Sequence, residues 1–185
     1  MDFDPRRYGA RVAQILALDG NGQRLMPLVA AGCCSEEARR AIRKETPETL
    51  FAGVPRPKGA MAGLWLYFSS LEEAHQIAQG DHSAEGSLWH AIVHRQEPDS
   101  GNSAYWHRKA GVHKTHKFLT VEALSIVKGY PEAEFRPSQK WDPFGFILFC
   151  ERAREQPGSP SERAALEIQR AEWQLLFDYC AKVDD

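Results

Sequence analysis

The stretch EGSLWHAIVHRQEPDSGNSAYWHR, residues 85–108, predicts two helices joined by a short turn. Ser83 can cap the first helix, and Pro98 ends it because proline keeps the residue before it out of the helical conformation. Beyond the turn, a second helix is expected to run as far as a stop at Gly111. The sequence therefore predicts a helical hairpin over residues 84–110, which carries most of the side chains capable of chemistry.

Helical spacing of apolar residues continues through most of the remaining chain. Further helices are expected at residues 8–18, after Ser35, at 59–79, at 118–128, at 142–154 and in the stretch before Cys180. No stretch shows the sustained alternation typical of a half-buried strand, so no sheet is expected. A chain of 185 residues fits one domain of ordinary size. We therefore predict a single compact all-α domain over residues 1–185, with about seven or eight helices.

Charge and composition argue against several classes of partner. Lys and Arg number 23 against 25 Asp and Glu, and no polybasic run is present, so nucleic acid is not expected as a partner. The longest mostly apolar run, residues 59–71, is shorter than the roughly 20 residues of a membrane-spanning helix. The first residues do not resemble a secretory signal, and the four cysteines form no C-x-x-C pair. A cytoplasmic protein with free thiols is expected.

Two histidines of the hairpin have the spacing of metal ligands. His90 and His94 are four residues apart, so a helix places both side chains on one face. Ala91 stands where the H-E-x-x-H metalloproteases carry their glutamate base, which excludes that mechanism. Glu97 lies roughly 10 Å further along the helix axis than His90, too far for one helix to complete a site. A third ligand has to come from another part of the chain.

The best source of that ligand is the end of the helix expected at residues 59–79. Its inward-facing apolar stripe continues into Glu72 and His75, which form the Glu-x-x-His motif of di-iron sites in helical bundles. Such sites use the motif twice, and this chain has one copy. The candidate metal ligands are Glu72, His75, His90 and His94, and a divalent metal is the candidate cofactor.

The preferred interpretation is a pocket, without metal, for a small molecule that could be anionic, and the metal site is the further alternative. The hairpin combines aromatic rings, arginines that could hold an anionic group, and histidines able to act as a general base. Whether such a pocket would be catalytic is left open. The candidate ligand-binding residues are His90, His94, Arg95, Glu97, Asp99, Tyr105, Trp106 and Arg108.

A purely structural role is the alternative to this pocket. The histidines would then be partly buried groups whose polar atoms are satisfied between packed helices, as buried polar groups require. The arginines of the hairpin would pair with its acids, and the module could be a monomer or a homo-oligomer without catalytic function. Surface positions are expected for three further histidines, His107, His113 and His116, because basic residues and a loop surround them.

The hairpin pattern EG-x-x-WHA-x-x-HR-x-EPD-x-x-N-x-x-YW-x-R resembles the central motif of an uncharacterised bacterial protein family. The resemblance extends to WDPFGF at 141–146, CE at 150–151 and EWQLLFDYC at 172–180. Family members tend to carry histidine-proline where this chain has His113 and Lys114, so that loop is expected to differ. The resemblance implies a shared fold and a hairpin that acts as one unit. It implies no activity, because none is known for the family.

Overall fold

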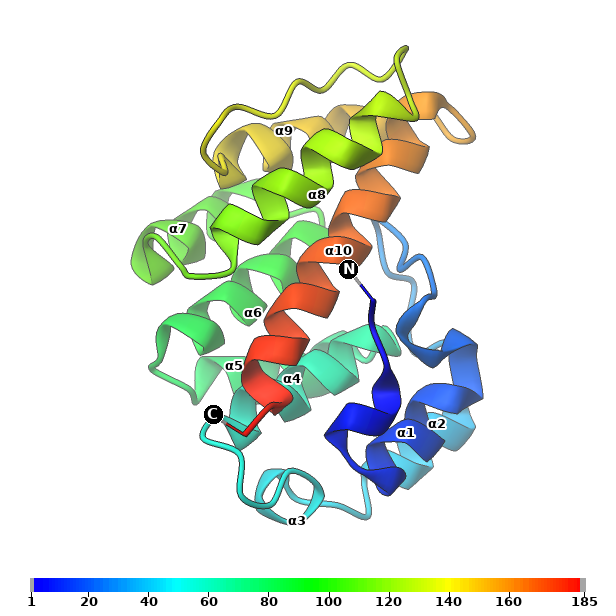
Figure 1. Cartoon of the computed structure of the whole chain (residues 1–185), viewed down its shortest axis with the longest axis vertical. Helices are drawn as coiled ribbons and strands as arrows, with labels where there is room; N and C mark the ends of the chain where they lie inside the picture. The colour runs from blue at the N-terminus through cyan, green and yellow to red at the C-terminus, as the bar shows by residue number, and fades with distance from the viewer. Residues whose placement is uncertain (1, 184–185) are drawn as a thin grey trace.

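The computed structural model describes residues 2–183, and every regular element in this range is a helix (Figure 1). The all-α class is therefore confirmed, although ten α-helices and two short 3₁₀ segments are found in these residues instead of seven or eight helices. None of the helices described is long and apolar enough to cross a membrane. The elements are η1 (Pro5–Tyr8), α1 (Ala10–Leu16), η2 (Ala17–Gly22), α2 (Glu36–Ile42), α3 (Pro47–Leu50), α4 (Pro57–Tyr67), α5 (Leu71–Gln79), α6 (Ala84–Gln96), α7 (Ser100–Ala110), α8 (His116–Lys128), α9 (Pro143–Arg154) and α10 (Pro160–Ala181).

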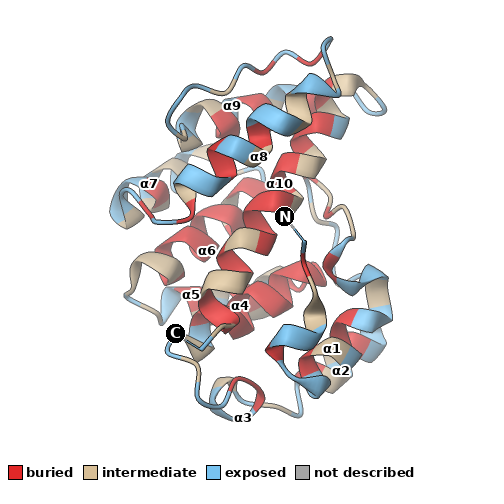
Figure 2. Ribbon diagram, in the orientation of Figure 1, coloured by how far each residue is buried: buried red, intermediate tan, exposed pale blue. Residues whose placement is uncertain are grey.

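The last helix, α10, organises the molecule. It runs along the long axis and is buried on much of its length (Figures 1 and 2). Its first half packs with α8 and α9 in one apolar core, which includes Ile168 and Phe149. Its second half packs with α1, α4 and α6 in another core, where Trp173 and Phe177 lie among Trp89 and other large side chains. One helix therefore contributes to both cores.

The prediction of a single helix at residues 59–79 is wrong, because the chain breaks between α4 and α5. Ser69 adopts a left-handed conformation with φ 57°, and the amide of Ser70 donates to the carbonyl of Trp65 at 3.1 Å. This geometry is typical of a helix C-terminus, but it usually involves glycine, so the sequence carries no ordinary stop signal here. The break redirects α5, which then packs against both α4 and α6 and brings His75 next to His90 of α6.

The predicted hairpin is confirmed as α6 and α7. The hydroxyl of Ser83 accepts from the amide of Gly86 at 3.0 Å and caps α6, and Gly111 ends α7 with φ 68°. Between the two helices, the Ser103 hydroxyl donates to the carbonyl of Ala91 at 2.8 Å. The turn, the caps and this cross-link hold α6 in a fixed position, which matters because α6 carries two of the three clustered histidines.

Replacing Gly63 with alanine is expected to lower the free energy of unfolding by about 1–3 kcal/mol. A Cβ atom at this position of α4 would lie 2.6 Å from Cζ2 of Trp89 and 3.1 Å from Cδ2 of Phe177, and both rings are fully buried. Urea denaturation measures the effect. The matched control is Gly101→Ala in α7, where the nearest atom lies at 3.6 Å and the exposed position should gain from alanine's helix propensity. Equal stability of Gly63→Ala and the parent would contradict this packing.

Candidate metal centre

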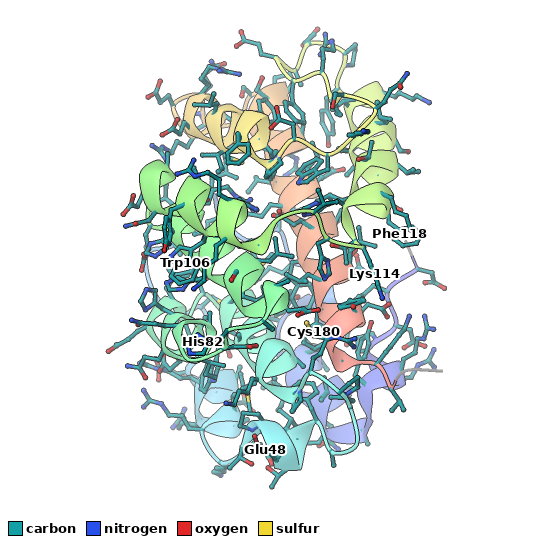
Figure 3. All side chains as sticks on the ribbon, turned by 90° about the vertical axis from the view of Figure 1, so that its left-hand side faces the viewer. Glu48, His82, Trp106, Lys114, Phe118 and Cys180 are labelled. Atoms are coloured by element: carbon teal, nitrogen blue, oxygen red, sulfur yellow. The ribbon has the colours of Figure 1, made fainter. Side chains whose placement is uncertain are left out.

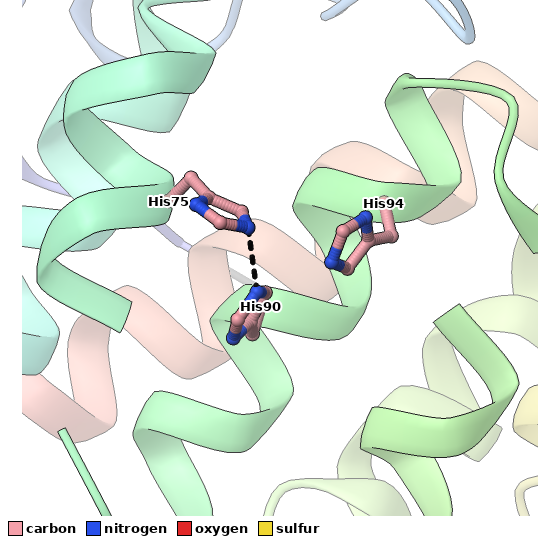
Figure 4. Close-up of side chains that lie close together, drawn as sticks. All are labelled: His75, His90 and His94. Atoms are coloured by element: carbon pink, nitrogen blue, oxygen red, sulfur yellow. Dashed lines mark hydrogen bonds between the residues drawn. The ribbon is translucent and has the colours of Figure 1, made fainter. Parts of the chain in front are cut away.

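Three histidines meet where α5 faces α6 (Figure 4). His75 comes from α5, and His90 and His94 come from successive turns of α6, as their spacing predicted. One ring nitrogen from each histidine lies within 4.8 Å of those from the other two, and the Nε2 atoms of His75 and His90 are 2.8 Å apart. The rings of His90 and His94 are nearly parallel, at 16°, whereas the His75 ring stands perpendicular to both.

The cluster contains no carboxylate among the residues described, so the expected Glu72 is not part of it. Glu72 is exposed one turn before His75 and lines a neighbouring pocket instead. The Glu-x-x-His motif therefore contributes its histidine alone. This excludes the carboxylate-bridged arrangement of the di-iron bundles, which needs glutamates between the two ions.

The centre of the cluster is shielded from solvent. His90 is buried, and the side chain of His94 is 12% exposed. The indole of Trp106 on α7 stacks on the His90 ring, with 3.8 Å between centroids and 20° between planes. The ammonium group of Lys109 lies over the Trp106 ring, with its Nζ 4.3 Å from the ring centroid. An ion at this place would have low exposure to water on the side of α7.

Glu97 lies at the end of α6, where its Oε2 is 3.0 Å from Nδ1 of His94. The two atoms are close enough for an ion pair but are not aligned as a hydrogen bond. A carboxylate at Nδ1 favours the tautomer whose Nε2 has a free lone pair, and it orients the ring, as carboxylates beside metal-binding histidines do. Glu97 is therefore placed to support His94, although it does not join the cluster itself.

The buried ring of His90 is in the form that binds metals. Burial, together with the neighbouring His75, His94 and Lys109, lowers the pKa of His90 to about 4. The ring is neutral at pH 7, so one of its nitrogens carries a lone pair. Nitrogens bound to zinc at about 2.1 Å stand about 3.4 Å apart in a tetrahedral site, which is within the spacing of this cluster.

An open pocket of about 660 Å³ lies beside the cluster. His75 and Glu97 form part of its wall, together with Arg39, Cys33 and Ser70. The hydroxyl of Ser70 is buried and has no hydrogen-bond partner among the described residues. Apart from Glu72, His75 and Glu97, the wall was not predicted, because its residues come from the loop before α2, from α2 itself, from the break before α5 and from other positions of α5. The pocket provides a route from solvent to His75.

The other hairpin residues expected in one pocket lie in separate surroundings. Consecutive helix residues point about 100° apart, so Arg95 faces α10 while His94 faces α5. Arg95 is buried, pairs with Glu172 and lies over the ring of Phe146 at 4.7 Å. Of the remaining expected residues, Asp99 caps α7, Tyr105 is 52% exposed, and Arg108 is exposed near Phe144 on α9.

The expectation that His107, His113 and His116 lie on the surface is wrong. His107 and His113 are 3% and 7% exposed, and His116 is half-buried. The segment after α7 folds back against α10, where the His113 ring meets the ring of Tyr179 at 4.7 Å and its Nε2 lies 3.4 Å from the carboxylate of Glu85. Basic neighbours in the sequence suggested exposure, but these neighbours point outward while the histidines point inward.

Comparisons of the chain with protein-family models, with curated proteins and with solved structures found no match. No relative therefore supplies a ligand or a reaction, and the function has to follow from the chain's own residues and their geometry.

Proposed function

We propose that this chain binds one divalent transition-metal ion, such as Zn²⁺, through ring nitrogens of His75, His90 and His94. The observation that carries the proposal is the convergence of three imidazoles from two helices within 4.8 Å. Imidazole nitrogen is a preferred ligand of Zn, Cu, Fe and Ni ions. Three protein ligands with one position left open are the pattern of catalytic zinc sites, whereas structural zinc sites close all four positions.

The hydrogen bonding of the cluster favours a bound cation over a purely structural seam. A neutral imidazole has one N–H and one nitrogen with a free lone pair. In the contact between His75 and His90, one Nε2 therefore donates its proton to the lone pair of the other. A cation at the centre would instead use a lone pair from each of the three rings.

The open position of such an ion would be reached from the pocket that His75 and Glu97 line. A zinc ion held by His75, His90 and His94 would supply a Lewis acid, and catalytic zinc sites lower the pKa of a bound water to about 7. Ser70 and Arg39 add a hydroxyl and a cation to the same pocket. We infer that the ligand of this pocket is a small polar molecule with an oxygen atom able to approach the ion.

Metal binding to histidine variants tests the proposal. Untagged protein freed of metal with a chelator should bind one equivalent of Zn²⁺ in isothermal titration calorimetry. His75→Gln, His90→Gln and His94→Gln should each lower the affinity at least tenfold, because each removes one of three ligands. His82→Gln is the matched control, since His82 is exposed on the loop before α6 and stands outside the cluster. Unchanged affinity in the three cluster variants would contradict the proposal.

The 2.8 Å contact between His75 and His90 also fits the structural alternative, and thermal unfolding separates the two roles. A ligand that binds the folded state alone stabilises it by about 2.7 kcal/mol at a concentration 100 times its Kd. The melting temperature of the wild type should therefore rise with Zn²⁺, and that of His94→Gln should not. If the cluster is only structural, Zn²⁺ should raise the melting temperature of neither protein, and metal-free His94→Gln should melt at a lower temperature than the metal-free wild type.

A further inference from the structure

A second cavity, of about 670 Å³, is formed by α8, the segments before α8 and α9, and the end of α10. It shares no lining residue with the three-histidine cluster or its pocket. The lining residues are Val112, His113, Lys114, His116, Lys117, Phe118, Thr120, Gln139, Lys140, Trp141 and Tyr179. The volume is within the range of about 300–1,000 Å³ that is typical of small-molecule sites.

The walls of this cavity are mainly apolar. Rings of Phe118, Trp141 and Tyr179 line it, and Val112 at its edge is 97% exposed. Phe118 is itself 52% exposed, and Figure 3 shows it near Lys114 where the chain enters α8. Large apolar side chains rarely remain this exposed around a concavity unless something covers them. The cavity therefore has the walls of a site for an apolar group.

The lysines are the charged side chains that line this cavity, and Asp142 lines only the adjoining hollow. Lys114, Lys117 and Lys140 contribute to the lining, and no aspartate or glutamate does. Within residues 2–183, none of these three ammonium groups forms a salt bridge. Lys117 instead lies over the ring of Phe118, with its Nζ 4.7 Å from the centroid. An anionic group at this edge would find cations that have no other anionic partner among residues 2–183.

Two side chains at the same place have buried polar atoms without partners among the described residues. Nε1 of Trp141 is a buried donor that finds no acceptor in the described part of the chain. His107 is 3% exposed, and both of its ring nitrogens likewise have no partner there. His107 lines an adjoining hollow of about 440 Å³, and both cavities share Trp141 and Lys140 in their walls. Because buried polar groups are normally bonded, a ligand with acceptor atoms would complete this region.

We propose that this cavity binds a small anionic amphiphile, in which a carboxylate meets the lysines and an apolar body lies between the rings. The carboxylate would accept charge-assisted hydrogen bonds from Lys117 and Lys140, which are stronger than those between neutral groups. An aliphatic or aromatic body would cover Phe118 and Trp141. The site is independent of the proposed metal centre, because the two share no residue.

Calorimetry with decanoate, kept below its micelle concentration, tests the proposal. One equivalent of decanoate should bind, and decyltrimethylammonium, which carries the opposite charge on the same chain, should bind at least tenfold more weakly. The double variant Lys117→Gln/Lys140→Gln should lose about tenfold or more in decanoate affinity, as expected for the loss of two charged donors. Lys128→Gln is the control, because Lys128 is exposed on the same helix but does not line the cavity.

A substitution at the edge of the cavity provides the second arm. Val112→Asp places a carboxylate at a position that is 97% exposed, so the fold should be unchanged in circular dichroism while decanoate affinity falls. His90→Gln should bind decanoate like the wild type, which separates this site from the metal centre. Equal binding of the cationic and anionic amphiphiles, or undiminished binding in both lysine and Val112 variants, would overturn the proposal.

Discussion

Replacement of Arg95 by methionine should lower the free energy of unfolding by about 3–5 kcal/mol, because it leaves the charge of Glu172 buried without a partner. Arg95 is 3% exposed, pairs with Glu172 on α10, and has its guanidinium over the ring of Phe146. Burial disfavours the charge of Arg95, yet the Glu172 carboxylate outweighs this effect and raises the pKa of Arg95 above its ordinary value. The pair lies between the two apolar cores, so its loss should destabilise the packing of both.

The double variant Arg95→Met/Glu172→Met provides the control for this effect. Replacement of both charges by apolar side chains of similar length should recover most of the lost stability, since a buried pair often contributes little compared with good apolar packing. Arg108→Met, at an exposed position on α7, should change stability by less than about 0.5 kcal/mol. Urea denaturation measures all three proteins. A loss of similar size in the single and double variants would mean that shape, rather than the unpaired charge, decides stability at this position.

Acidification from pH 6.5 to pH 5 should destabilise the metal-free protein, and His107 should account for a large part of the effect. Burial lowers the pKa of His107 to about 3, and the nearby charges of Arg95 and His116 act in the same direction. In the unfolded chain this histidine takes up a proton near pH 6.5, whereas in the folded chain it stays neutral. The free energy of unfolding therefore falls by about 1.4 kcal/mol for each pH unit below 6.5, and it is unaffected by His107 above pH 7.

In His107→Leu, the number of protons taken up on unfolding at acidic pH should fall by close to one. The change of the urea midpoint between pH 7 and pH 5 measures this difference. Part of the dependence should remain, because burial also lowers the pKa of His116 and that of His90 to about 4. His82→Gln should leave the pH dependence unchanged, since His82 is exposed. The account of His107 would be wrong if His107→Leu kept the full pH dependence of the parent protein.

The parts of the fold that the sequence predicted well are those that local chemistry decides. Ser83, Pro98 and Gly111 are strong helix start and stop signals, and the hairpin of α6 and α7 follows them closely. The break at Ser69 was missed because a serine there adopts a conformation that glycine usually supplies. The short helix α3 was also missed, since its four residues are too few to show periodicity.

The candidate site was predictable only in part. The spacing of His90 and His94 correctly placed both on one face, and His75 was rightly expected opposite them, although α5 reaches that position as a separate helix. Glu72 was wrongly included, because sequence spacing does not show which side chain of a helix turn faces a partner helix. Burial of His107 and His113 depends on how α10 packs against distant segments, and no local pattern contains that information.

Anomalous X-ray scattering at the zinc edge, from crystals of untagged protein soaked with one equivalent of Zn²⁺, would show whether the three histidines bind the ion. We expect one strong peak between α5 and α6, about 2.1 Å from a ring nitrogen of each of His75, His90 and His94. The peak should be absent from crystals of His90→Gln prepared in the same way. Zinc located only at surface side chains, with the three imidazoles unoccupied in the wild type, would contradict the account.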